Sequence, residues 1–487
     1  MTRKIVSSKN VLSVPRPFSQ AVRSGQFMYL SGQVGMNPKT GLPIMGIQDL
    51  PPTQRKFFSG KLSLFERTHL APAAAQTYWI MENMHTLLKE QRASLDDLVK
   101  VNVYLQDMEN YEGVESVFRR IFPRTPPACT VLEVPKIGAH KDLRVTIDGI
   151  AVIPSKNSGT IKKEVIRLGD VPEPAGHFSQ AVKCGNLIFI SGLIALDADT
   201  GGLVRSYRDL GPEGVVLARK YPTVNRRQEK VRAQMFKVFQ HIGAILESQG
   251  SALDQILYGF LYTRDMRTDF NSCLPIWEHC IPKGPPACSG FGMPDIRRDQ
   301  EVMVEMDAIA LLPSPHMRRK ANVKFDPKLT NPTCHYTMAC ASDKYLFLSG
   351  RGGINWQRGG ELVMRFSELT DWNGQGQLAG RFHEEDPVLS QTWYIYETIK
   401  NVLATQGATM DDVIKTNVWL KDMRNFPKVE AIAKDFFPNG GPAMTMIPVK
   451  NIGPWEGDGL TELHVEIDCT AAMPKGPRSS SKAKIFY

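Results

Sequence analysis

The sequence lacks the features of secreted and membrane proteins. Its eight cysteines are scattered through 487 residues and form no Cys-x-x-Cys pair, whereas small secreted scaffolds are dense in cysteine. No apolar stretch approaches the ~20 residues that a bilayer-spanning helix needs. Residues 1–10 carry positive charge but no apolar segment follows them, so they do not resemble a secretory signal. We therefore expect a cytoplasmic protein with reduced thiols and no membrane association.

Composition and charge indicate a folded chain with a basic first third. Hydrophobic residues make up 42% and charged residues 22%, as in globular proteins, and the length allows about two to four domains. Residues 1–158 hold 20 basic and 13 acidic side chains, whereas residues 321–487 hold 18 and 19. This excess favours an acidic partner, such as an acidic protein or a larger assembly. Nucleic acid is disfavoured because aromatic and basic residues are not interleaved.

An internal repeat sets the domain organisation. The phrase Phe-Ser-Gln-Ala-Val at 18–22 returns at 178–182 and, altered to His-Tyr-Thr-Met-Ala, at 335–339. Later landmarks follow in the same order in each copy: a Ser-Gly pair, a glutamine in a helical segment, an Asp-Met pair and a closing aspartate. Such self-similarity indicates tandem copies of one unit. We predict domains at 1–158, 159–320 and 321–475, followed by a C-terminal tail at 476–487.

Each copy shows the pattern of a two-layer α+β unit. The expected order is strand, strand, long helix, strand, helix, strand, strand. In the first copy, apolar residues between Trp79 and Leu88 form a helical stripe, and residues 98–105 alternate as in a half-buried strand. Helices on one face of the sheet leave its other face to be covered. The two other copies can supply that cover.

These phrases resemble the RidA/YjgF family, also called the L-PSP endoribonuclease family. Its members carry a Tyr/Phe-Ser-Gln-Ala-Val phrase, a Ser-Gly pair, a Pro-Pro-Ala-Arg strand start and a Val-Glu-Ile-Glu-Ala-Ile-Ala ending, and all three copies follow that order. The resemblance implies chorismate-mutase-like α+β subunits that assemble as trimers, with clefts between neighbours. Three linked copies are then expected to form an intramolecular pseudo-trimer with three unequal clefts and to behave as a monomer.

The resemblance also implies a chemistry, the hydrolysis of 2-iminobutanoate or 2-iminopropanoate to a 2-keto acid and ammonia. In it an arginine holds the substrate carboxylate and a glutamate assists water attack. The arginine position is occupied here by Cys129, Cys288 and Met444. The acid position holds the three catalytic candidates, Asp148, Asp307 and Asp468. The other cleft positions are Phe18, Ser31, Gly32, Phe178, Ser191, Gly192, Tyr336, Ser349 and Gly350.

Loss of the arginine favours a degenerate site, so the leading interpretation is a small-molecule-binding or scaffold protein. The alternative is an imine deaminase with a divergent cleft. Arg124 and Arg144 lie near the motif positions in sequence, and we interpret them as surface arginines, with entry into a cleft as the alternative. An endoribonuclease is a weaker alternative, because no repeated acid and base pair is present.

Other reactive groups give weaker hypotheses. A nucleophilic thiol at Cys129 or Cys288 would need a base or a cation, and no histidine occupies a matching position in both copies. Cys334, His335 and Cys340 do not have the spacing of a structural zinc site. We therefore predict neither a metal nor a cofactor.

A long, partly apolar segment at 47–72 lies between the first Ser-Gly pair and its helix. Such segments are usually functional or pack onto the domain. Lys56, Phe57, Phe58 and Lys61 combine aromatic surface with positive charge, so we predict that they bind a partner. Packing onto the core is the alternative.

Overall fold

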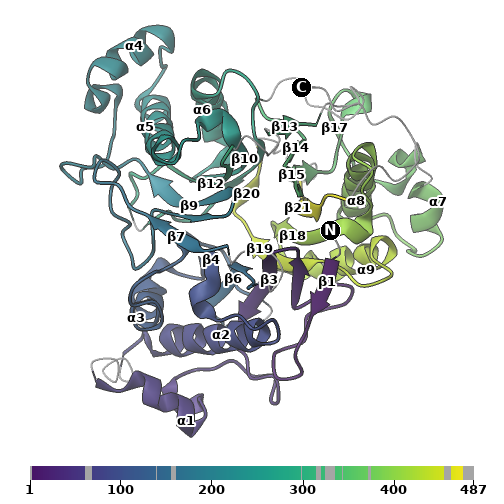
Figure 1. The fold of residues 1–487 in the computed structure, drawn as a ribbon. Coiled ribbons are helices and arrows are strands. Elements are labelled where there is room, and N and C mark those ends of the chain that lie inside the picture. The colour runs from purple at the N-terminus through teal and green to yellow at the C-terminus, as the bar shows by residue number, and fades with distance from the viewer. Residues whose placement is uncertain are drawn as a thin grey trace.

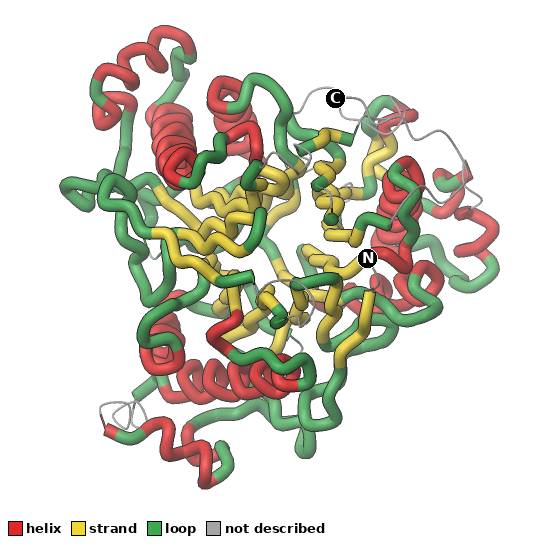
Figure 2. Tube along the Cα trace, viewed as in Figure 1, coloured by secondary structure: helices red, strands yellow, loops and turns green. Residues whose placement is uncertain are grey.

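The computed structural model describes residues 3–60, 68–138, 140–154, 161–297, 299–313, 320–323, 335–342, 344–370, 374–453 and 462–474. Three lobes surround a common centre (Figure 1). The strands gather toward that centre and the helices lie on the outside (Figure 2). No helix in these ranges is long and apolar enough to span a membrane.

Copy one forms a six-stranded sheet in the order β1-β2-β3-β6-β4-β5. One strand more precedes the order expected from the sequence, because the short β1 is mostly exposed and carries little apolar periodicity. Neighbouring strands are antiparallel except β4 and β5, which α3 connects. The strands are β1 (Arg3–Val6), β2 (Ala21–Ser24), β3 (Phe27–Val34), β4 (Leu98–Leu105), β5 (Ala128–Glu133) and β6 (Val145–Val152), with helices α1 (Pro52–Arg55), α2 (Ala71–Lys89) and α3 (Tyr111–Ile121).

Copy two repeats this order and gains a seventh strand from copy three. The added strand, β20 (Asn451–Ile452), pairs antiparallel with β11. The copy's own strands are β7 (Lys163–Ile166), β8 (Ala181–Cys184), β9 (Leu187–Ile194), β10 (Ile256–Thr263), β11 (Ala287–Gly292) and β12 (Val304–Leu311), with helices α4 (Pro212–Lys220), α5 (Arg226–Ser248) and α6 (Met266–Cys280).

Copy three has the same sheet order and an additional two-stranded sheet. Its main strands are β13 (Ala321–Asn322), β14 (Ala339–Ala341), β15 (Tyr345–Gly352), β18 (Val413–Leu420), β19 (Ala443–Pro448) and β21 (Val465–Ala472); β16 (Ile354–Asn355) pairs with β17 (Glu361–Leu362), and the helices are α7 (Gly374–Ala379), α8 (Pro387–Thr405) and α9 (Phe426–Phe436). These three sheets with their helices confirm the α+β class.

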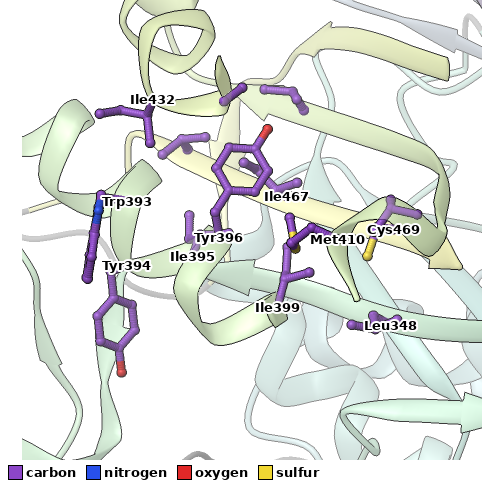
Figure 3. Close-up of a cluster of buried hydrophobic side chains, with 14 of the residues drawn as sticks. Leu348, Trp393, Tyr394, Ile395, Tyr396, Ile399, Met410, Ile432, Ile467 and Cys469 are labelled. Carbon is purple, nitrogen blue, oxygen red and sulfur yellow. The ribbon is translucent and has the colours of Figure 1, made fainter. Parts of the chain in front are cut away.

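Each sheet buries one face under its own helices. In copy three, α8 places Trp393, Ile395 and Tyr396 against Ile467 of β21 and Ile432 of α9, and Figure 3 shows this packing. The long helices of copies one and two cover their sheets in the same way. The glutamine in each helix fixes it to loops, as Gln76 does by donating to the carbonyl oxygens of Ile44 and Asp142 at 3.0 and 2.9 Å.

The other sheet faces meet at the centre. Two buried clusters there draw side chains from all three copies. Tyr104, Tyr262 and Trp419 hold the same position in β4, β10 and β18, and all three belong to one cluster. The face that a lone copy would leave open is thus covered by the two others.

Three equivalent bridges close the copies into a ring. The start of β5 pairs through Ala128 with Ser179 of copy two, Ala287 of β11 pairs with Thr337 of copy three, and Ala443 of β19 pairs with Ser19 of copy one. We call these contacts the 1–2 seam, the 2–3 seam and the 3–1 seam. The predicted monomeric state in solution stays a prediction.

Candidate functional site at the seams

The Ser-Gly serines connect the copies. Ser191 Oγ donates to its own copy's Ser179 carbonyl oxygen at 2.5 Å and accepts from the backbone nitrogen of Cys129 at 2.8 Å. Ser31 and Ser349 accept from the backbone nitrogens of Met444 and Cys288 at 2.7 and 2.9 Å. All three serines are fully buried. Each hydroxyl therefore donates within its own copy and accepts from the neighbouring copy across the seam.

The glycine after each serine makes room for the neighbouring strand. A Cβ at Gly192 would lie 1.9 Å from Glu305 Oε1, and one at Gly350 would lie 1.8 Å from Glu466 Oε1. In copy one the matching residue is Thr146, whose methyl group would lie 3.2 Å from a Cβ at Gly32. Two seams therefore hold a buried glutamate that the third lacks.

A lysine neutralises the predicted catalytic aspartate in the 1–2 seam. Lys100 Nζ of β4 lies 3.2 Å from Asp307 Oδ2 of β12, and both side chains are about 95% buried. The same ammonium donates to Thr130 Oγ1 at 2.7 Å and to the carbonyl oxygen of Ile190 at 2.8 Å. Asp307 is thus held in a cross-copy ion pair.

The 3–1 seam repeats that pair. Lys415 Nζ lies 3.0 Å from Asp148 Oδ2, which also accepts from Thr445 Oγ1 at 2.5 Å. Phe18 packs beside Phe426 of copy three, with 6.3 Å between ring centroids, and belongs with Met444 to that copy's core. The arginine position of this seam is filled by packing side chains.

The 2–3 seam breaks the pattern. Tyr258 stands where the other seams have lysine, and its hydroxyl lies 2.6 Å from Ser289 Oγ. Asp468 accepts instead from Asn417 Nδ2 at 2.9 Å and from Trp419 Nε1 at 2.7 Å. Burial raises the pKa of Asp468 to about 7, and these two hydrogen bonds oppose the shift.

Glu466 lies in the same seam. Burial raises the pKa of Glu466 to about 8, with a further rise from Asp468 and an opposing effect of a hydrogen bond from Ser289 and of Arg351. A carboxyl group whose pKa lies near neutral pH can hold or release a proton under cellular conditions. The 2–3 seam therefore contains two such groups on one strand face.

An arginine from outside the family motif enters the 1–2 seam. Arg297 lies on the loop between β11 and β12 with a φ of 62°. Its Nη2 donates to the carbonyl oxygen of Gly192 at 3.1 Å and to Glu305 Oε1 at 3.2 Å, and its guanidinium lies 5.4 Å from the ring centroid of Phe178. This cation is held by its own copy's glutamate.

A second arginine occupies the 2–3 seam. Arg351 of β15 follows the Ser-Gly pair directly and is 6% exposed. Burial lowers its pKa, opposed by the neighbouring Tyr336, Tyr394 and Glu466 and by Tyr258 across the seam. Arg351 thus interacts electrostatically with Tyr336, which keeps the tyrosine of the family phrase, and with the carboxyl group of Glu466.

Several sequence-predicted groups have other roles. Burial raises the pKa of Cys129 to about 12, so its thiol stays protonated and is a poor nucleophile. Arg144 donates to Gln106 Oε1 at 2.8 Å, and Arg124 is exposed; neither is near Cys129 in any described contact. No cluster of metal ligands occurs in the described ranges, and Cys334 lies outside them.

The predicted docking residues are partly in the core, which corrects that prediction for Phe58. Phe58 is 2% exposed and packs with Ile44, Ile47 and Tyr78. Phe57 is half-buried, with its ring centroid 4.4 Å from that of Tyr78. Lys56 is exposed, and Lys61 lies outside the described residues. The aromatic pair follows the packing alternative because α2 and α3 offer it an apolar surface.

Substituting Phe58 with alanine should therefore lower the melting temperature. A fully buried phenylalanine cut to alanine typically costs about 3–5 kcal/mol of unfolding free energy. Lys56→Glu, two residues away and exposed, should leave the melting temperature within about 1 °C, since surface changes rarely exceed about 0.5 kcal/mol. Thermal unfolding followed by circular dichroism compares the two. Equal melting temperatures for the two variants would contradict the assignment of Phe58 to the core.

Comparisons with known proteins agree with the repeat. The seams join three linked, subunit-like domains, and the candidate site residues lie at these seams. The family model for endoribonuclease L-PSP (Ribonuc_L-PSP) matches residues 48–153, 217–312 and 328–473. These matches cover more than half of the chain, so it belongs to this family, three times over.

Relatives match one copy's length at a time. The RutC family protein PH0854 of Pyrococcus horikoshii is 28% identical over 31% of this chain and 97% of its own. The 2-iminobutanoate/2-iminopropanoate deaminase of Dermatophagoides farinae is 27% identical over 30% of this chain and 99% of its own. The crystal structure of yeast Mmf1 is 26% identical and covers 31% of this chain and 99% of its own, with a TM-score of 0.24.

Proposed function

We propose that this chain binds a small molecule bearing a carboxylate at the 2–3 seam, and that the other two seams serve mainly to hold the ring. One observation carries the proposal. Asp148 and Asp307 are paired with lysines, whereas Tyr258 takes the lysine position in the 2–3 seam and leaves Glu466 and Asp468 with raised pKa values.

Arg351 is the cation proposed to hold the ligand. A guanidinium is suited to planar, two-point recognition of a carboxylate. Arg351 interacts electrostatically with Tyr336, Glu466 and Tyr258. Because the pKa of Glu466 is about 8, its carboxyl group is largely protonated at pH 7. A protonated neighbour competes less with a ligand carboxylate for the guanidinium than an ionised one. In the 1–2 seam, Arg297 and Glu305 form an ion pair at 3.2 Å.

A second candidate is imine hydrolysis at the same seam. Two relatives, from Dermatophagoides farinae and Arabidopsis thaliana, are named as deaminases. Glu466, with its pKa of about 8, has the protonation behaviour that a general acid or base needs. The motif arginine is absent from all three copies, which favours binding over turnover. The acidic partner expected from the basic first copy stays a prediction.

The binding proposal is tested by titrating the protein with 2-oxobutanoate in a calorimeter. We expect one site per chain. Arg351→Met should weaken binding about tenfold or more, because a charge-assisted bidentate contact contributes more than about 1.4 kcal/mol. Arg297→Met, a matched loss of a buried guanidinium in the 1–2 seam, should leave the affinity within about twofold. Arg351→Lys, which retains the charge, should show an intermediate affinity.

Two outcomes would contradict the proposal: binding lost in Arg297→Met but kept in Arg351→Met, or no binding to the folded wild-type protein. The second candidate is tested in parallel with 2-iminobutanoate. We expect little or no hydrolysis. Turnover that Glu466→Gln abolishes, while 2-oxobutanoate still binds, would establish the enzyme instead.

A further inference from the structure

A cavity of about 720 Å³ lies at the outer edge of the 3–1 seam. Its walls come from the N-terminal segment of copy one and the loop that follows α9 of copy three. The size lies within the ~300–1,000 Å³ typical of small-molecule sites. Phe18 of the family phrase lines it, but neither Met444 nor the Ser31-Gly32 pair does, so it shares only part of the motif positions of this seam.

A histidine contact that the two other seams share is missing beside the cavity. In the 1–2 seam His177 Nε2 donates to the carbonyl oxygen of Phe122 at 2.6 Å, and in the 2–3 seam His335 Nε2 donates to that of Ile281 at 2.5 Å. The matching residue in the 3–1 seam is Pro17, which has no side chain that can make this contact. Pro17 and Phe437, the counterpart of Phe122, both line the cavity.

A hydroxyl is missing from the same place. In the 1–2 seam a Cβ at Gly176 would lie 1.5 Å from the hydroxyl of Tyr111, so that hydroxyl fills the space beside the glycine. The 3–1 seam has Phe426 in place of the tyrosine and Arg16 in place of the glycine. The 3–1 seam therefore lacks the hydroxyl that fills this space in the 1–2 seam, and it has the cation of Arg16 there.

The lining is amphipathic and basic. Buried Phe18 and Phe437 form its apolar part, together with Ile5, which is 43% exposed. Lys9 and Arg16 are exposed on its rim, and Lys434 also lines it but pairs with Glu430 at 2.8 Å. Among the described residues that line the cavity, none is acidic. Copy two has glycines, Gly169 and Gly176, where copy one has Lys9 and Arg16.

We propose that this cavity binds a small amphipathic organic anion, with an aromatic or short alkyl body against Phe18 and Phe437 and an acid group near Lys9 and Arg16. Apolar area and positive charge at one concave site select for such a ligand. The site goes beyond the function proposed for the 2–3 seam and shares no residue with it.

The test uses 1-anilinonaphthalene-8-sulfonate, whose fluorescence rises in apolar sites, on the full-length protein. We expect one saturable site per chain that octanoate displaces and octanol, its uncharged analogue, does not. Lys9→Glu with Arg16→Glu should weaken binding about tenfold, because two exposed charges near the acid group are reversed. Lys39→Glu with Lys56→Glu, a matched reversal of two exposed lysines outside the cavity, should leave the affinity unchanged.

Pro17→His tests the cavity itself. It restores the residue that occupies the other two seams, so it should abolish probe binding, while a melting temperature at or above the wild-type value shows that the fold is intact. Wild-type affinity in both Pro17→His and the Lys9/Arg16 variant would overturn the proposal. Equal displacement by octanol and octanoate would also overturn it, because the site would then select for apolar area alone.

Discussion

Replacing Tyr258 with lysine is expected to remove much of a pH dependence of stability that the wild-type protein shows between about pH 5 and pH 8. The lysine would occupy the position of Lys100 and Lys415, each of which pairs with an aspartate across its seam. Its positive charge would lower the pKa of Asp468 and, to a smaller extent, the pKa of Glu466. The groups facing them are Arg351, Lys415, Asp148 and Tyr258.

The sign follows from proton binding. The folded-state pKa values of about 7 and about 8 lie above the ordinary values of 3.8 and 4.5, so the folded chain holds more protons than the unfolded chain over this range. The unfolding free energy therefore falls as pH rises toward the folded-state values, by roughly 4 kcal/mol for each of the two carboxyl groups. Below the ordinary pKa values both carboxyl groups are protonated in the folded and in the unfolded chain. The unfolding free energy then no longer changes with pH through these two groups.

The measurement is the denaturant midpoint from pH 5 to pH 9 for the wild type and two variants. Tyr258→Phe removes the hydroxyl without adding charge, so its profile should keep the wild-type slope. Tyr258→Lys should give a clearly flatter profile. Identical profiles for all three proteins would show that the 2–3 seam carboxyls do not hold protons near neutral pH.

Replacing Lys100 with methionine is expected to destabilise the whole ring. Lys100 and Asp307 are both about 95% buried, and removing one partner of a buried ion pair leaves the other charge unpaired, at a typical cost of about 3–5 kcal/mol. The melting temperature should fall by about 10 °C. Lys400→Met removes a closer pair, 2.7 Å from Glu397 but half-exposed at the lysine, and should change the melting temperature by less than about 1 °C.

The double variant Lys100→Met/Asp307→Asn separates charge from packing. Neutralising the abandoned aspartate should recover at least half of the loss, because the unpaired charge and not the missing lysine stem carries most of the cost. No recovery in the double variant would mean that Lys100 acts by packing alone, and that the seam aspartates have not been neutralised by lysine.

The repeat was predictable because its landmarks serve one purpose in every copy. Gln20 and Gln180 each tie down the preceding loop, donating to the carbonyl oxygens of Val11 and Val171 at 2.9 and 2.7 Å. The phenylalanine of the phrase enters the preceding copy's core, as Phe178 does in copy one. Residues with such fixed local or seam roles recur in sequence, so the α+β copies and their order could be inferred from them.

The charges that distinguish the seams were harder to predict. Glu305 and Glu466 stand two residues before the predicted aspartates, and strand alternation places them on the same face, so this signal was present in the sequence. Arg297 could not be found in this way, since it enters from a loop that no repeat landmark fixes. The lysine-to-tyrosine change at Tyr258 could be interpreted only once the structure showed that Asp468 faces Tyr258 across the 2–3 seam.

The asymmetry of the seams is the main consequence of joining three copies in one chain. A ring of identical subunits must repeat every residue at every seam. Here Lys100, Tyr258 and Lys415 hold one position, where the two lysines pair with aspartates and the tyrosine contacts Ser289. One seam can therefore lose its ion pair while the other two retain theirs and stabilise the fold.

A crystal structure of the protein grown with 2-oxobutanoate tests the central claim most directly. The account predicts the ligand at the 2–3 seam, with its carboxylate on Arg351 and its carbonyl end toward Glu466, and no ligand beside Cys129 or Met444. A ligand bound at Arg297 in the 1–2 seam, with the 2–3 seam unchanged, would contradict it.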